Sequence, residues 1–150
     1  MQYFSIMNGT MHVLLFLIYA PVFAQGDSMI GEYFLQLGDV EARIIEYTLT
    51  LEQDGTFYFH SYAKSSENIG VPEEVHQYGR GTWKSQDKKI LFFTNPEKDL
   101  TEKYSLNLAN SRAHFITKSK RSSSEHPFKT RLKFFESDIF WIKGVEIFKR

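Results

Sequence analysis

Apolar and polar residues alternate without exception along residues 45–52, with Ile, Tyr or Leu at the odd positions and Glu or Thr at the even positions. A period of two is the signature of a β-strand that buries one face. This run leads through Asp54-Gly55 into a second apolar-rich run at residues 57–62. Asp-Gly between two such runs predicts a hairpin, because Gly tolerates the positive φ that a tight turn demands.

The rest of the chain gives further runs of this kind and no long stretch of helical spacing. Their number and their spacing of about 8–12 residues predict an all-β fold, an antiparallel up-and-down β-barrel of about 8–10 strands. A closed barrel is favoured because closure removes exposed strand edges. We expect Gly79 and Gly81, inside one run, to mark a bend or bulge. The further runs are residues 29–37, 78–84, 89–94, 104–108, 113–117, 130–135, 139–142 and 145–148.

Alternation also predicts which side chains point inward. A barrel of about eight strands has an interior that side chains fill or that holds one small ligand. The bulk of the inward residues suits a filled core, and the alternative of a ligand cavity stays open. The predicted inward set is Tyr47, Leu49, Leu51, Phe57, Phe59, Trp83, Phe92, Leu106 and Phe134.

Composition agrees with a single folded domain. The chain has 150 residues, 42% of them hydrophobic and 24% charged, which is typical of a globular protein. Its 14 Phe and 8 Tyr suit pleated, half-buried surfaces. There is no Cys, so the domain must be stable without disulfides and has no Cys to accept a lipid anchor.

The N-terminal residues have the pattern of a secretory signal peptide. Residues 1–25 contain no charged side chain, and residues 13–20 form an unbroken apolar run followed by Pro21. Ala24 ends a stretch that fits a cleavage site before Gln25, although no basic residue precedes the apolar run. We therefore expect a signal peptide at 1–24 and a mature domain at 25–150, exported to the periplasm or the extracellular space.

Three segments carry a resemblance to a known family: Gly31-Glu32-Tyr33, the hairpin at 49–57, and the Gly-Thr-Trp run at 79–84 with its partner strand. On these residues the chain resembles the lipocalin-like group of small exported bacterial β-barrel proteins. It differs from true lipocalins in having Tyr33 at a usual Trp position, no disulfide pair and no evident C-terminal helix. The resemblance implies a lipocalin-like barrel that binds a small apolar ligand or lipid in its interior.

The first candidate site follows from this expectation: a ligand site lined by Tyr47, Phe57, Phe59, Trp83 and Phe92. No metal site is predicted, because the histidines lack the local spacing of a ligand set, although His60, Tyr62 and His76 can meet across neighbouring strands, as can His114. Nucleophile elbow, phosphate loop and paired-carboxylate patterns are also missing, so we expect no enzymatic activity and no cofactor.

Charge suggests a second candidate. Acidic residues outnumber basic ones in 26–75 and basic residues dominate 76–150, where a cluster flanks a polar loop. The predicted anion-binding residues are Lys120, Arg121, Lys129 and Arg131. The alternative function is therefore a non-enzymatic interaction module with a filled core, whose loops contact an envelope protein or an anionic surface polymer. We expect no nucleic-acid partner and no membrane-spanning segment in the mature chain, and the sequence leaves the oligomeric state open.

Overall fold

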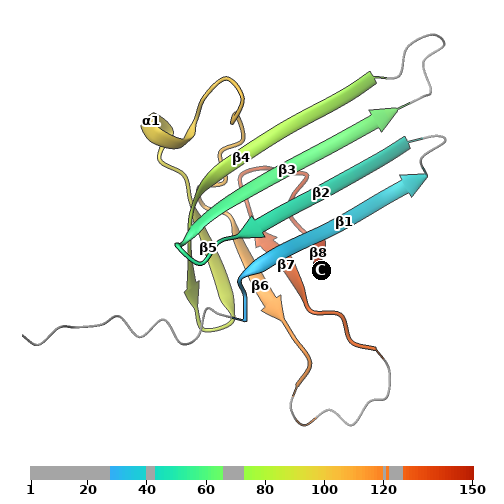
Figure 1. Cartoon of the computed structure of the whole chain (residues 1–150), viewed down its shortest axis with the longest axis vertical. Coiled ribbons are helices and arrows are strands. Elements are labelled where there is room, and N and C mark those ends of the chain that lie inside the picture. The colour runs from blue at the N-terminus through green and yellow to red at the C-terminus, as the bar shows by residue number, and fades with distance from the viewer. Residues whose placement is uncertain (1–27, 40–42, 66–72, 120, 122–126) are drawn as a thin grey trace, which may run out of the picture.

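The computed structural model describes residues 28–39, 43–65, 73–119, 121 and 127–150. In this part of the chain, eight antiparallel strands pair in chain order and the last pairs with the first, which closes a barrel. The predicted all-β, up-and-down barrel is thus confirmed (Figure 1). Its elements are β1 (Gly31–Asp39), β2 (Arg43–Leu51), β3 (Thr56–Ser65), β4 (Glu73–Gln86), β5 (Lys89–Phe93), the short helix α1 (Pro96–Asp99), β6 (Arg112–Ile116), β7 (Arg131–Glu136) and β8 (Glu146–Lys149).

The predicted hairpin is formed by β2 and β3, and its turn is held from two sides. Gly55 has φ +85°, the conformation for which Gly was expected. The backbone N–H and the hydroxyl of Thr56 donate to Asp54 Oδ1 at 2.9 and 2.6 Å. The backbone N–H of Trp83 donates to the Gly55 carbonyl at 2.7 Å, which ties the turn to β4.

The two glycines of β4 lie where neighbouring chain approaches most closely. A Cβ at Gly81 would overlap the Phe93 carbonyl oxygen, and a Cβ at Gly79 would overlap the side chain of Leu108. The ladder between β3 and β4 runs without a register shift, so there is no bulge, but β4 bends where it passes from β3 to β5 (Figure 1). Gly is therefore required for close packing at the predicted bend.

Two predicted strands are wrong. Residues 104–108 contribute one isolated parallel bridge, between Gly79 and Leu106, because β5 pairs directly with β6 and leaves that segment no place in the ladder. Residues 139–142 form turns, in which the N–H of Ile142 donates to the Ile139 carbonyl at 3.1 Å. An apolar run predicts burial, but periodicity alone does not separate a strand from a turn that fills a core.

The predicted inward set is confirmed, since all nine side chains are buried, from Leu49 at 0% exposure to Leu106 at 8%. The rings of Phe57 and Phe92 meet edge to face with centroids 5.1 Å apart, and Phe92 stacks on Phe134 at 5.5 Å. Because such contacts link strands from both halves of the barrel, the aromatic side chains form one core.

The strands differ in length, so part of the sheet stands beyond the barrel. β8 pairs with β1 only at Tyr33 and Phe34, and β5 pairs with β4 only from Thr82 onward. Figure 1 shows β1 to β4 running on together past the other four strands. We call this part the extension; it consists of residues 35–39, 43–47, 60–65 and 73–78.

Candidate binding site at the barrel mouth

The five predicted ligand-lining residues lie together in the barrel interior, where they pack on one another and on other core side chains. Phe57, Phe59 and Phe92 are at most 2% exposed, and Tyr47 and Trp83 are 6% and 8% exposed. The indole N–H of Trp83 is also occupied, because it donates to the Glu52 carbonyl at 3.0 Å. All five residues therefore belong to the packed core of the barrel.

Trp141 closes the end of the interior that opens toward the extension. Its ring stacks on Tyr47 with centroids 5.7 Å apart and planes 12° apart, and it lies 6.3 Å from the ring of Phe59. The turn that carries Trp141 is fixed to the barrel, because the Gly144 N–H donates to the Phe134 carbonyl at 2.8 Å. Sequence analysis missed this role, since it assigned residues 139–142 to a strand; the signal that was available is Gly144, which interrupts the run.

Beyond Trp141, the inner face of the extension continues the apolar surface of the core. The strand register places Leu37 opposite Ile45, Ile45 opposite Ala63, and Ala63 opposite Val75. We call these four residues the mouth row. They lie on the same face as Tyr47, because side chains two residues apart in a strand share a face. Leu37 and Val75 are 44% and 43% exposed, so the row is apolar but only partly covered.

Polar residues border the mouth row on the side nearer the tip of the extension. The next row toward the tip of the extension pairs Asp39 with Arg43, Arg43 with Ser65, and Ser65 with Glu73. On the barrel side of the row, Leu35 is partly buried against the core cluster. Ile45, within the row, also packs against this cluster. Along β1 and β2 the inner face therefore changes from buried aromatic, through partly covered aliphatic, to charged. On β3 and β4 the mouth row is flanked by polar residues on both sides, Ser61 and Ser65 on β3 and Gln77 and Glu73 on β4.

The turn that carries Trp141 also holds a large exposed side chain. Phe140, which precedes Trp141 in the turn, is 86% exposed, the highest exposure among the large exposed hydrophobic residues. Single exposed hydrophobic residues are ordinary, but several that gather at one end of a domain indicate an interaction surface.

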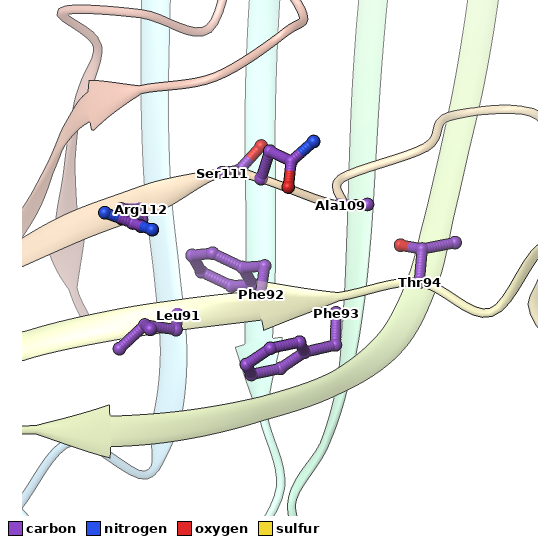
Figure 2. Close-up of a pocket in the computed structure, with 8 residues that line it drawn as sticks. Leu91, Phe92, Phe93, Thr94, Ala109, Ser111 and Arg112 are labelled. Atoms are coloured by element: carbon purple, nitrogen blue, oxygen red, sulfur yellow. The ribbon is translucent and has the colours of Figure 1, made fainter.

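Two small pockets indent the barrel elsewhere. One, of about 140 Å³, lies between β5 and the chain leading into β6, and Figure 2 shows Leu91, Phe92 and Phe93 on one side and Ala109, Ser111 and Arg112 on the other. The second, of about 180 Å³, lies beside α1 and includes Arg80. Arg80 is already engaged there, because its guanidinium donates to the carbonyls of Lys98 and Asp99. Both are smaller than typical ligand pockets of roughly 300–1,000 Å³.

The three histidines in the described part of the chain divide between two places. His60 and His76 meet, with His60 Nε2 3.0 Å from His76 Nδ1, and Tyr62 lies beside them, as the strand pairing allowed. His114 lies apart from them and stacks on Phe135 at 4.2 Å. Within the described residues, no three or more His, Cys, Asp or Glu side chains come together as a metal site.

The predicted anion-binding residues are only partly placed. Lys120 falls outside the described residues, while Arg121 and Lys129 are exposed. Arg131 is engaged with a carboxylate, since its Nε lies 2.8 Å from Glu146 Oε2, and Lys133 Nζ lies 3.0 Å from the other oxygen of that group. Arg131 thus shares a single carboxylate with Lys133, and these three side chains together keep a net positive charge.

Comparison with known proteins adds no relatives. No family model, no curated protein and no solved structure matches the chain. In the described part of the chain, no helix has the length and hydropathy that crossing a membrane would require. The predicted signal peptide at 1–24 lies outside the described residues.

Proposed function

We propose that this chain is an exported, lipocalin-like binding protein that holds an apolar ligand, such as an acyl chain, at the mouth of its barrel and not in the interior. The observation that carries the proposal is the mouth row, a line of four apolar side chains that crosses β1 to β4 beyond the buried core and is partly exposed to solvent at both ends. Aromatic rings of the predicted interior site pack on one another, which favours the adjoining surface as the place for a ligand.

The mouth row offers an acyl chain a surface with little reorganisation. Its four residues come from four paired strands, and the ladder between each pair is continuous through this region. Complete burial of one Val or Leu side chain contributes roughly 1.5–3 kcal/mol. Because Leu37 and Val75 are each a little over two-fifths exposed, covering both contributes roughly 1–2 kcal/mol.

The polar row at the tip gives the ligand an orientation. A chain that lies along the inner face meets Trp141 and Tyr47 at the barrel end and Arg43 with its polar neighbours at the other. An amphipathic molecule fits this order, because its apolar chain covers the mouth row while its polar head stays among charged groups in water. Ligand sites of this kind combine an apolar lining with a few placed polar groups.

The two tryptophans allow a direct test with a fatty acid that carries a nitroxide quencher on its chain. Trp141 lies at the mouth and Trp83 lies in the core, 8% exposed and bonded to the Glu52 carbonyl. In a Trp83→Phe variant, where only Trp141 emits, we expect saturable quenching by the labelled fatty acid. In a Trp141→Phe variant, where only Trp83 emits, quenching should be several-fold weaker.

A surface control separates site binding from nonspecific adsorption. Leu37→Glu and Val75→Glu place charge in the mouth row at positions that already contact water, so they should fold while losing the saturable quenching of Trp141. Ile90→Val, in the buried core, should leave the quenching unchanged. Equal quenching of both tryptophans, or quenching that survives the Glu variants, would show that the mouth is not the site.

A further inference from the structure

The outer face of the extension carries a cluster of rings that is separate from the mouth row. Alternation along β3 and β4 sends His60, Tyr62, His76 and Tyr78 to this face, while Ala63 and Val75 on the same strands point to the inner face. His60 stacks on Tyr78, its direct cross-strand partner, with centroids 4.5 Å apart and planes 5° apart. Tyr62 packs on its own partner, His76, at 4.8 Å.

The two histidines meet through their ring nitrogens. His60 Nε2 and His76 Nδ1 are 3.0 Å apart, whereas the ring centroids are 5.2 Å apart and the planes differ by 4°. Because the centroids are farther apart than the nitrogens, the rings meet edge to edge and not face to face. A hydrogen bond between these atoms needs one nitrogen that carries hydrogen and one that offers a lone pair.

This arrangement tolerates one extra proton but not two. A first proton can be added at a ring nitrogen that faces away from the partner, which leaves the shared hydrogen in place. When both rings are imidazolium, both facing nitrogens carry hydrogen, so the hydrogen bond is lost and two positive charges lie side by side.

Neighbouring charged groups offset this repulsion only in part. Glu74, on the same face of β4, is paired with Lys64 of β3 at 2.9 Å, so its attraction for a proton on His76 is weakened but not removed. Glu46 of β2 attracts a proton toward His60, but burial and His76 outweigh it, and the pKa of His60 lies below its ordinary value. The other titratable groups that face the cluster are Tyr62, Tyr78, Tyr104 and Lys103, whose Nζ lies 5.1 Å from the Tyr78 ring.

We propose that the His60–His76 pair is a proton-controlled clasp, which holds the far ends of β3 and β4 together near neutral pH and releases them in mild acid. The segments released are residues 60–65 and 73–78, whose ladder is the outermost part of the β3–β4 pairing. In this part β4 pairs with β3 alone, apart from the Leu106 N–H that donates to the Tyr78 carbonyl. The clasp depends on these ring contacts and not on a ligand, but because Ala63 and Val75 of the mouth row lie on the same two segments, its opening also divides the mouth row.

The direction of the pH effect follows from a comparison of the open and closed states of the clasp. In the open state each imidazole titrates near the ordinary histidine pKa of about 6.5. In the closed state the pKa of His60 is lower, chiefly because of burial. Between these two pKa values the open state binds a proton that the closed state does not, so acid favours opening. The opening equilibrium should rise about tenfold for each pKa unit that separates the two states.

Hydrogen exchange of backbone amides tests the clasp in the whole protein. After correction for the intrinsic pH dependence of exchange, those amides of 60–65 and 73–78 that bond across the β3–β4 ladder should lose protection several-fold or more between neutral pH and a pH below 6, while core amides such as that of Leu49 should not. His60→Gln and His76→Gln should flatten this dependence, because each removes one of the two titrating groups. His114→Gln, in a histidine outside the cluster, should behave as the wild type.

The titration of the imidazoles gives a second measurement that needs no folded variant at the clasp. Nitrogen-15 spectra of the wild-type protein should show the two imidazoles titrating as a coupled pair, with the pKa of His60 below its ordinary value. Two independent steps near pH 6.5, or equal protection of residues 60–65 at both pH values, would overturn the proposal.

Discussion

Trp141 and Tyr47 stack with their ring planes only 12° apart and their centroids 5.7 Å apart, which joins a turn late in the chain to a strand near its start. This contact separates the packed interior from the open inner face of the extension. Trp141 is itself half-buried, so it belongs to the core on one side and to the surface on the other.

Removal of this ring should therefore both weaken the fold and uncover the interior. We expect Trp141→Ala to lower the free energy of unfolding by about 2–3 kcal/mol, less than the ~3–5 kcal/mol of a fully buried Trp or Phe. Urea unfolding measures the loss, and binding of an apolar fluorescent dye measures the opening. Phe140→Ala is the matched control: it removes a neighbouring but 86% exposed ring and should change neither quantity appreciably.

Gly81 and Gly144 should respond very differently to the same substitution. A Cβ at Gly81 would overlap the Phe93 carbonyl oxygen and press on the ring of Phe57, so we expect Gly81→Ala to cost more than about 2 kcal/mol or to prevent folding. Gly144 has φ +90° but no atom within 4 Å of the added Cβ. Gly144→Ala should then cost only the backbone strain, about 1–2 kcal/mol. A similar loss in both variants, measured by thermal unfolding, would contradict the close approach at β4.

Tyr33 should make the barrel sensitive to alkali. Its hydroxyl donates to the Met29 carbonyl at 2.6 Å, and burial raises the pKa of the phenol well above its ordinary value of 10. Above that value the unfolded chain loses a proton that the folded chain keeps, so the free energy of unfolding should fall as pH rises through about 10 and beyond.

The variant Tyr33→Phe isolates this contribution. It should cost about 1–2 kcal/mol at neutral pH, because the buried Met29 carbonyl loses its donor, and it should make the alkaline loss shallower. Tyr58→Phe, at an outer position that is 47% exposed, provides the control and should leave the pH profile unchanged. An alkaline profile that is identical in Tyr33→Phe and the wild type would exclude Tyr33 as its source.

The export prediction rests on sequence alone and needs its own measurement. We expect the protein recovered from the periplasm or medium of a bacterial host to begin at Gln25, as read from its intact mass. Ala24→Tyr, which places a bulky residue just before the expected cut, should leave the uncleaved chain to accumulate. A full-length protein that remains in the cytoplasm would show that residues 1–24 are not a signal peptide.

The alternation of residues 45–59 was sufficient to predict the central hairpin and the burial of its odd-numbered side chains. This succeeded because a period of two has a single geometric meaning when a turn such as Asp54-Gly55 separates two runs. Leu106 shows the limit of the same signal. Its burial was predicted correctly, but its strand was not, since alternation reports which side chains are covered and not which backbone pairs with which.

Alternation predicts which side chains point inward, but it does not give the distances between them on which the candidate site depends. Tyr47 and Phe59 were correctly expected to point inward, yet the space beside them depends on the ring of Trp141, which contacts both from a position more than 80 residues further along the chain. The mouth row could not be predicted from the sequence for a similar reason. Leu37 and Val75 are exposed because β8 is shorter than β1 and β5 is shorter than β4, and strand length relative to a partner is a property of the whole barrel.

The shared strands of the extension carry one more consequence. Because Ala63 and His60 sit on opposite sides of β3, a substitution changes a single surface, but the loss or gain of one residue within Thr56–Ser65 inverts every side chain beyond it. Such an insertion before His60 would send its imidazole toward the barrel opening and Ala63 to the outside. This hairpin should therefore accept many point replacements in evolution while refusing changes of length.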